Sequence, residues 1–252
     1  MKHLLIDADI VLHRATSAAE KDTRFDEDYH ILMSNPTDAF NIADDMIYEL
    51  METANTNECE LCFTDSNNFR KGLSESYKMH RKSSRRPLCY AEVKGMLMEK
   101  YTSQQWSNLE ADDVLGIMLT RDPEKYVIWS IDKDLMQIPG NHLINDEIQF
   151  VSPETGLRFF WKQMLMGDIT DGYKGCKGVG EVAASKIVGS LDLEDPWPTI
   201  VATYEKAKMT EADALYNARM AHILQDGDYD QHNGEVNLWQ PPFTQPNKKV
   251  HI

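Results

Sequence analysis

The sequence predicts an α/β protein with a mostly parallel, doubly wound sheet, and three observations lead to this fold class. Short apolar runs such as HLLID, CELCFTD and YVIWSID alternate with segments whose apolar residues recur at helical spacing. The run YVIW is apolar without interruption, as expected of a strand that is buried on both faces. The chain has 252 residues, which is enough for one large α/β domain with a smaller helical part.

The first elements follow directly from these patterns. A strand ends near Asp7 and leads into a helix, and a second strand ends near Asp65. Between them, apolar residues at helical spacing predict a helix over Pro36–Thr53, which Thr37 or Asp38 would cap.

The later elements complete the alternation. Helices are expected over AEVKGMLMEKY and LEADDVLGIMLT, followed by the strand that ends near Asp132. Beyond Pro153 the pattern is mostly helical, and EVNLW closes the chain as a short strand. We therefore expect an α/β core over residues 1–160, with a basic helical arch at about 70–92, and a helical part over residues 161–252.

Acidic side chains gather where the apolar runs stop, which is where an open α/β sheet presents its functional residues. Nine of them fall in five places: Asp7; Asp65; Glu110, Asp112 and Asp113; Asp132 and Asp134; Asp168 and Asp171. Each group has an ordinary explanation on its own, because acids complement the start of a helix and also occur in turns. Their recurrence at five element ends predicts that they converge.

Convergent carboxylates imply a particular chemistry. Like charges in one cleft cannot all ionise without raised pKa values or bound cations. Acidic oxygens bind hard cations such as Mg²⁺ or Mn²⁺, and a pair of such ions serves phosphoryl transfer. The sequence therefore predicts a metal-dependent nuclease.

The charge distribution indicates a phosphate-binding surface, although the formal net charge of the chain is -15. Residues 70–86, which we call the basic tract, carry seven basic side chains against the single acid Glu75, a local balance of +6. These are Arg70, Lys71, Lys78, Arg81, Lys82, Arg85 and Arg86. The alternative is a solvated loop with incidental charge.

A second candidate DNA contact is the glycine-containing stretch over residues 174–186. Its glycines permit close backbone approach, and the helix that follows offers N–H groups to a phosphate. The stretch fits a helix–hairpin–helix element, which holds DNA by its backbone; a glycine at the end of a helix is the alternative. The candidate contacts are Lys174, Gly175, Lys177, Gly178, Gly180 and Lys186.

Several other classes of protein find no support in the sequence. There is no GxxxxGK[ST] phosphate loop. The DGDYDQHNGEVN segment has Gln231 where a calcium loop requires glycine and Asn237 where it requires glutamate. No apolar run approaches the roughly 20 residues of a membrane span, and Asp7 interrupts any leader peptide. We expect a cytoplasmic protein without a membrane partner.

In this order, the motifs LIDAD, FTDSNNFRKG, YKMHRK, LEADDVLG, SIDKDLMQIPG and GDITDGYKGCKGVG resemble the 5′-nuclease (flap endonuclease-like) superfamily. The resemblance covers nearly the whole chain and looks closest to the 5′→3′ exonucleases of short-tailed, T-odd-type bacteriophages. It implies a hydrolase that acts in DNA replication, in the cytoplasm of a bacterial host if the protein is phage-encoded.

The resemblance also implies roles for individual residues. Asp7, Asp65, Glu110 and Asp112 would hold the more deeply placed ion; Asp132, Asp134, Asp168 and Asp171 would hold the other, partly through water, with Asp113 completing the site. Lys78 and Arg81 match the basic pair that such enzymes present to the scissile phosphate. The glycine-containing stretch matches the duplex-binding element, which can also hold K⁺.

The expected substrate is double-stranded DNA with 5′ ends, and the expected enzyme is a monomer. Nicks, flaps and RNA–DNA hybrids stay open as substrates, because the arch is short and no sliding-clamp peptide is recognisable at the end of the chain. Two other classes also stay open: a non-catalytic, structure-specific DNA-binding protein and an RNA-directed nuclease of related fold.

Overall fold

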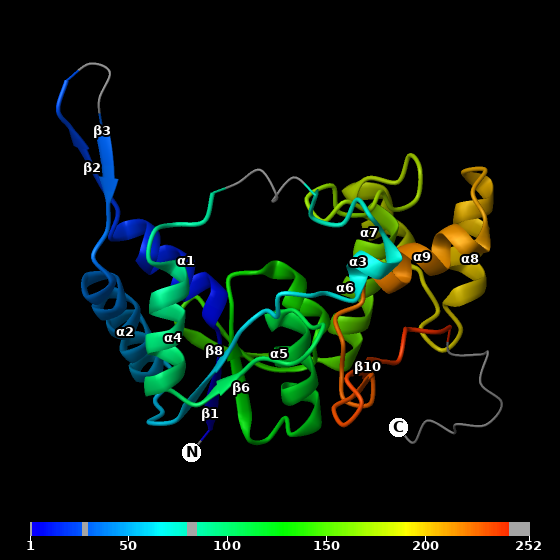
Figure 1. Cartoon of the computed structure of the whole chain (residues 1–252). Coiled ribbons are helices and arrows are strands. Elements are labelled where there is room, and N and C mark those ends of the chain that lie inside the picture. Colours follow the sequence, from blue (N-terminus) through cyan, green and yellow to red (C-terminus); the bar gives the residue numbers. More distant parts are fainter. Residues whose placement is uncertain (1, 27–29, 80–84, 242–252) are drawn as a thin grey trace.

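The computed structural model describes residues 2–26, 30–79 and 85–241 (Figure 1). Within these residues the main sheet has the strand order β5–β4–β1–β6–β7–β8, in which only β8 is antiparallel to its neighbour. The strands are β1 (His3–Asp7), β4 (Cys59–Cys62), β5 (Ser103–Gln104), β6 (Tyr126–Trp129), β7 (Gly140–Ile144) and β8 (Glu147–Val151).

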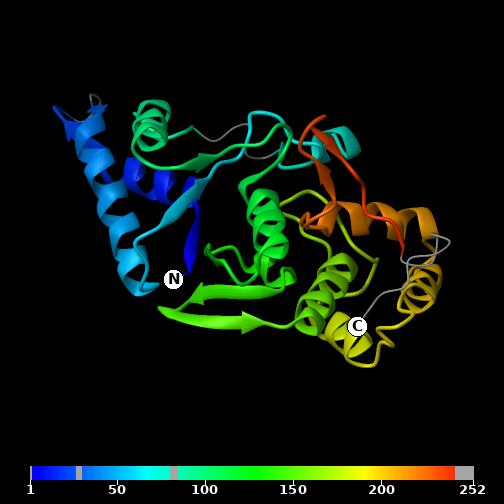
Figure 2. The same cartoon turned by 90° about the horizontal axis from the view of Figure 1, so that it is seen from below.

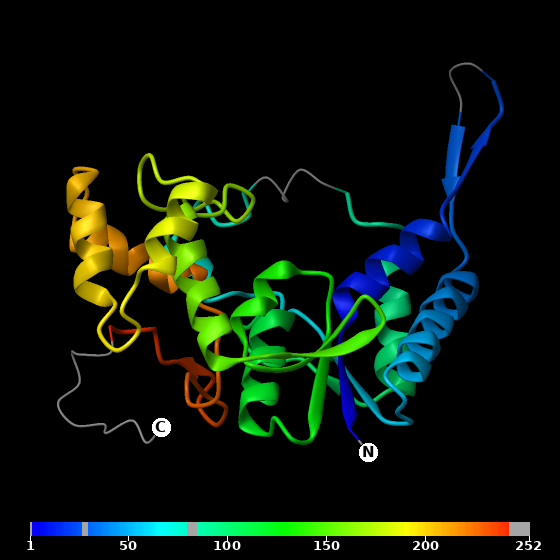
Figure 3. The ribbon, with the colours of Figure 1, turned by 180° about the vertical axis from the view of Figure 1, so that it is seen from behind.

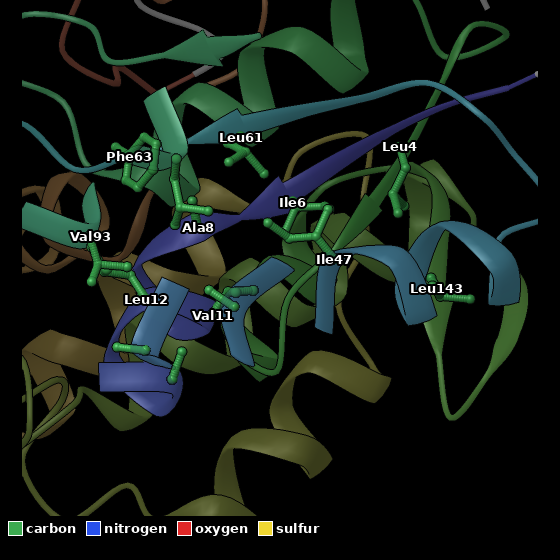
Figure 4. Packing of buried hydrophobic residues seen from close by; sticks show 14 of the residues in the cluster. Leu4, Ile6, Ala8, Val11, Leu12, Ile47, Leu61, Phe63, Val93 and Leu143 are labelled. Atoms are coloured by element: carbon green, nitrogen blue, oxygen red, sulfur yellow. The ribbon is translucent and has the colours of Figure 1, made fainter. Parts of the chain in front are cut away.

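Helices cover both faces of this sheet, as the predicted doubly wound fold requires. They are α1 (Ala8–Ala18), α2 (Pro36–Thr53), α4 (Tyr90–Lys100) and α5 (Ala111–Arg121). Side chains alternate along β1: Leu4 and Ile6 pack with α1, α2 and α4, whereas Leu5 packs with α5 on the opposite face. Figure 4 shows the first of these clusters, with Leu4 and Ile6 close to Val11 of α1 and Ile47 of α2.

The helical part lies beside the sheet, on the side opposite α1 and α2 (Figures 1 and 2). It consists of α6 (Pro153–Met166), α7 (Glu181–Gly189), α8 (Trp197–Lys206) and α9 (Glu211–Ala221), which share a third buried cluster. Short strands β9 (Tyr229–Asp230) and β10 (Glu235–Val236) pair after it. The expected boundary at residue 160 falls inside α6, which contacts both α9 and the 3₁₀ helix η2 (Lys133–Gln137) of the core.

The structure differs from the sequence-based expectation at one helix start and in one hairpin. Asn35, and neither Thr37 nor Asp38, caps α2, because its Oδ1 accepts hydrogen bonds from both of their amides (2.8 and 3.3 Å). The hairpin of β2 (Lys21–Arg24) and β3 (His30–Met33) was not expected; it stands off from the body (Figure 3). Its mostly exposed strands lack the alternation that identifies a half-buried strand.

The basic tract is not a helical arch in its described part. Its first residues form the one-turn helix α3 (Arg70–Leu73), residues 74–79 form turns, and residues 85–87 are irregular. Lys78 adopts a positive φ of 49°, which a helix does not accommodate. Residues 80–84, with Arg81 and Lys82, lie outside the described residues.

Candidate active site

Neighbouring parallel strands place the first predicted carboxylates at one edge of the sheet. β4, β1 and β6 lie side by side, so the segments after their carboxyl ends meet there. Asp7 is the last residue of β1, Asp132 follows β6, and α5 begins just after Glu110. This arrangement is the one predicted from the apolar runs.

Five of the nine predicted carboxylates line a single small cavity of about 20 Å³, which we call the acidic cavity. They are Glu110, Asp112, Asp132, Asp134 and Asp171, accompanied by Arg70, Tyr77, Lys78, Gln163 and Tyr173. A larger cavity of about 410 Å³ lies between η2, α6 and the segment that ends at Trp239, but none of the predicted metal-binding residues lines it. The predicted chemistry therefore belongs to the smaller one.

Mutual repulsion and burial shift the acids of this region in the direction expected of a cation site. Burial, then the carboxylates of Asp9 and Asp132, raise the pKa of Asp7 to about 7, although Ser130 donates a hydrogen bond to it. Burial and Asp7 raise the pKa of Asp112 well above its usual value, and burial and Asp132 raise that of Asp134 to about 6. A divalent cation would favour the ionised form of all three.

The donor set fits such a cation in chemistry. Asp134 Oδ1 is buried without a hydrogen-bond partner, and the other donors are carboxylate oxygens, which Mg²⁺ and Mn²⁺ prefer. In the described part of the chain, no three acidic, histidine or cysteine side chains are close enough to one another to hold an ion by themselves. A cation would therefore need ligands drawn together or bridged by water.

Lys78 provides positive charge within the cavity. Its Nζ lies 2.7 Å from Glu110 Oε1 and 3.6 Å from Asp171 Oδ2, and its backbone N–H donates to Asp171 O at 3.3 Å. Burial alone would lower the pKa of Lys78, but Glu110 and Asp171 raise it, so the amine stays charged. Lys78 thus separates two carboxylates that would otherwise repel each other.

Glu110 differs from the other acids because it is surrounded by donors. Tyr77 donates its hydroxyl to Oε2, and the guanidinium of Arg70 lies 3.5 Å from the same oxygen. Burial alone would raise the pKa of Glu110, but Lys78 and Arg70 lower it to about 2. Glu110 is therefore ionised at any pH at which the protein is expected to work.

Two predicted functional residues form a structural pair instead. Asp113 is fully buried, and its carboxylate accepts both terminal nitrogens of Arg70 at 2.7 and 2.8 Å. It also accepts the amides of Glu110 and Leu224. The prediction that Asp113 binds metal is corrected because its oxygens are occupied, and the prediction that Arg70 contacts DNA is corrected because the side chain is only 4% exposed.

Asp65 and Asp168 do not line the acidic cavity. Asp65 accepts hydrogen bonds from the Asn108 amide (3.0 Å) and from Gln105 (3.1 Å); burial alone would raise its pKa, but these bonds lower it. Asp168 caps its own loop by accepting the amides of Thr170 and Asp171 at 2.6 and 3.1 Å. The Asp65 amide donates to the Leu109 carbonyl, next to Glu110, and Asp168 lies in the loop that carries Asp171.

The remaining candidate DNA contacts fall into three groups. Lys71, Lys174, Lys177, Lys186, Gly178 and Gly180 are exposed, as predicted for a DNA-facing surface. Arg85 and Arg86 are exposed beyond the undescribed residues of the basic tract, where Arg85 pairs with Glu20. Gly175 is buried: its amide donates to Asn217 Oδ1, and an added Cβ would lie 2.3 Å from the Gly167 nitrogen. The prediction that Gly175 contacts DNA is corrected, because this glycine permits close packing of two backbone segments.

Comparison with known proteins is consistent with this geometry. A family model described as the N-terminal resolvase-like domain of 5′-3′ exonucleases matches residues 2–163, more than half of the chain. The chain belongs to the 5′-3′ exonuclease family. This exonuclease is 30% identical to the exonuclease of Escherichia phage T7, across 94% of this chain and 93% of that protein. It is 29% identical to the exodeoxyribonuclease of Enterobacteria phage T3, across 94% and 92% of the two chains.

Two solved structures are similar to this exonuclease in fold. A flap endonuclease of bacteriophage T5, in a complex with DNA and metal ions, has a TM-score of 0.65 at 11% identity, with 88% of this chain and 89% of that chain covered. The catalytic core of Rad2 with a DNA substrate has a TM-score of 0.51 at 16% identity, with 96% and 83% covered. The predicted fold class and the predicted family are both confirmed.

Sequence reasoning missed three polar side chains of the exonuclease that line the acidic cavity: Tyr77, Gln163 and Tyr173. Two of them had a signal, since Tyr77 precedes Lys78 in the YKMHRK motif and Tyr173 follows Asp171 by two positions. Gln163 had none, because it lies in the last turn of α6 next to buried apolar residues. In the described part of the chain, no helix is both long and apolar enough to cross a membrane.

Proposed function

We propose that the protein hydrolyses phosphodiesters from the 5′ ends of double-stranded DNA with the help of two divalent cations, Mg²⁺ or Mn²⁺. The observation that carries this proposal is the acidic cavity itself, which is lined by five carboxylates from separate parts of the sequence and by Lys78. Membership of the 5′-3′ exonuclease family supports the direction of attack.

The carboxylates divide between the two ions by their position. Asp7, Glu110 and Asp112 lie at the ends of β1 and the start of α5 and would hold the first ion. Asp132, Asp134 and Asp171 would hold the second, with Asp168 acting through water. Asp65 would join the first ion with the lone pairs left over from its hydrogen bonds with Asn108 and Gln105. When bound, the ions lower the pKa of a water and offset the charge that develops on the phosphate.

Residues of the chain itself orient the reacting groups. Tyr77 holds Glu110 through its hydroxyl, and Ser130 holds Asp7 at 2.8 Å, so each carboxylate has a fixed direction. Once cations neutralise Glu110 and Asp171, the amine of Lys78 becomes available to the phosphoryl oxygens, where a positive charge stabilises the transition state. Arg81 would act beside it, as its position in the YKMHRK motif implies.

We infer that the exposed surface beyond the cavity holds the duplex. Lys174, Lys177 and Lys186 lie on or beside the loop between α6 and α7, and Gly178 and Gly180 leave open space around their backbones. This loop supports a helix–hairpin–helix role and a K⁺ site. The similar flap endonuclease and Rad2 structures, both in complexes with DNA, support DNA as the partner. Flaps, nicks and RNA–DNA hybrids are further candidate substrates, and we propose that the enzyme acts as a monomer.

The direct test is digestion of linear duplex DNA labelled at either the 5′ or the 3′ end, with Mg²⁺ and with a chelator. Early release of short products from the 5′-labelled strand, only with Mg²⁺, is the expected result. Replacing Asp132 with Asn removes a carboxylate from the cavity and should abolish cleavage while DNA binding persists. The matched control is Asp45→Asn, which removes an equal charge from the exposed face of α2 and should cleave like the wild type.

Two results would contradict the proposal. Equal turnover by Asp132→Asn and the wild type would exclude Asp132 from the site. Binding without cleavage of duplex, nicked and flapped DNA in the presence of Mg²⁺ would instead make the protein a DNA-binding protein without nuclease activity.

A further inference from the structure

Two buried polar atoms without a hydrogen-bond partner line the acidic cavity, and they come from different parts of the chain. One is Asp134 Oδ1, in η2, and the other is the hydroxyl of Tyr173, in the loop after α6. Among the described residues, Ser34 Oγ and Trp161 Nε1 are the other two such atoms, and neither residue lines this cavity. Buried polar atoms are nearly always paired, so two in one place indicate a ligand.

The size of the cavity restricts what that ligand is. Its volume of about 20 Å³ exceeds the roughly 10–15 Å³ that one water molecule requires. A nucleobase needs far more space. Tyr173, Asp134, Asp171 and Gln163 all line the same walls, so a water there would find both donors and acceptors. The cavity therefore has room for a water molecule, free or bound to a cation.

Burying the unpaired hydroxyl of Tyr173 lowers the stability of the fold. The side chain is 2% exposed and belongs to the apolar cluster of the helical part, where a phenylalanine ring would pack without burying a polar atom. Backbone hydrogen bonds between Asp168 and Tyr173 (2.9 and 3.0 Å) fix the loop, and packing in the helical cluster holds the ring inside. Packing does not explain the hydroxyl, and a ligand does.

We propose that Tyr173 is a positioning residue of the cation site: its hydroxyl donates a hydrogen bond to a water molecule of the divalent cation that Asp134 holds. The inference rests on the proposed function, which supplies the cation. Residues that orient the ligands and waters of a metal in this way affect metal affinity by about 10–100-fold. Tyr173 would thus contribute to metal binding without touching the metal.

The experiment is to replace Tyr173 with Phe and to titrate Mn²⁺ and Mg²⁺ by calorimetry, without DNA. Because Tyr173→Phe removes only the hydroxyl, we expect the metal affinity to fall by about tenfold or more. In chelator, the melting temperature should equal or exceed that of the wild type, because an unpaired buried group has been removed. Weaker metal binding together with equal or higher stability is a combination that a purely structural role does not produce.

The matched control is Tyr204→Phe. The Tyr204 hydroxyl is equally buried, but it donates to the Met164 carbonyl at 2.9 Å, and neither Tyr204 nor Met164 lines the cavity. Its removal should lower the melting temperature and leave the Mn²⁺ affinity unchanged. The control separates loss of a buried hydroxyl in general from loss of this one.

The outcomes separate the inference from the proposed function. Unchanged Mn²⁺ affinity in Tyr173→Phe, or no Mn²⁺ binding by the wild type, overturns the inference whatever the cleavage assay shows. Weaker Mn²⁺ binding in Tyr173→Phe, combined with a wild type that cleaves no DNA, upholds the inference about the cation site and contradicts the nuclease activity.

Discussion

An arginine–carboxylate ion pair lies at each end of the basic tract. The two pairs have the same bidentate geometry, but one is buried and the other is exposed to solvent. The two terminal guanidinium nitrogens of Arg70 donate to the carboxylate oxygens of Asp113 at 2.7 and 2.8 Å, and those of Arg85 donate to Glu20 at 2.7 and 2.8 Å. Side-chain exposure is 4% and 0% in the first pair but 56% and 13% in the second. The distances alone would rank the two pairs as equal.

The difference in burial gives the two ends different roles. The Arg70 guanidinium also donates to the carbonyl oxygens of Met220 and His222, so it joins the core to the helical part, and loss of either partner leaves an uncompensated buried charge. The second pair is screened by solvent and exchanges readily with water. The amino-terminal end of the tract is therefore fixed to the cavity, and the carboxy-terminal end is held by a surface contact.

Breaking the buried pair should give the largest effect on stability. Arg70→Met leaves the Asp113 carboxylate buried without its partner, and we expect the free energy of unfolding to fall by about 3–5 kcal/mol. Urea denaturation of the metal-free protein measures this loss. The matched control, Arg85→Met, should unfold close to the wild-type midpoint. Equal losses in the two variants would show that burial does not distinguish the pairs.

Lys78 sharpens the comparison because it lies at the fixed end, inside the acidic cavity. Lys78→Met removes the charge proposed to stabilise the transition state, so we expect cleavage to slow by about 10²–10³-fold. The same change removes a cation that competes for Glu110 and Asp171, so Mn²⁺ binding without DNA should tighten by a factor of a few. Calorimetry and single-turnover cleavage measure the two effects, and weaker Mn²⁺ binding would contradict the proposed position of Lys78 between the ligands.

Much of this site could be predicted from the sequence because strand ends in a parallel sheet meet at one edge. Asp7, Asp132 and the start of α5 reach that edge for this reason. Burial could not be predicted in the same way. Arg70 and Arg85 look alike in a charge run, and only the packing of α3 against α9 makes one of them an interior residue.

Individual contacts between segments that are distant in the sequence could not be predicted either. The position of Asp113 next to Asp112 indicates the start of a helix, but not which of the two faces the interior. Asp65 follows its strand as expected, but the sequence does not indicate that its carboxylate accepts a hydrogen bond from the Asn108 amide. Tyr173 reads as one more apolar residue of a loop until the cavity beside its hydroxyl is known.

The smallest predicted effect concerns the exposed end of the tract, where two adjacent arginines should behave differently. Arg86 is exposed over the Tyr90 ring, whose hydroxyl donates to Asp9 at 3.2 Å, so its charge lies on the side of the molecule where Asp9 neighbours Asp7. Arg86→Met should reduce the slope of log affinity for duplex DNA against log salt concentration by about 1. Arg85→Met should leave the slope unchanged, because Glu20 already neutralises that charge. Equal reductions would mean that Arg85 leaves Glu20 for a phosphate when DNA binds. The exposed ion pair would then open on DNA binding and would not hold this end of the tract in place.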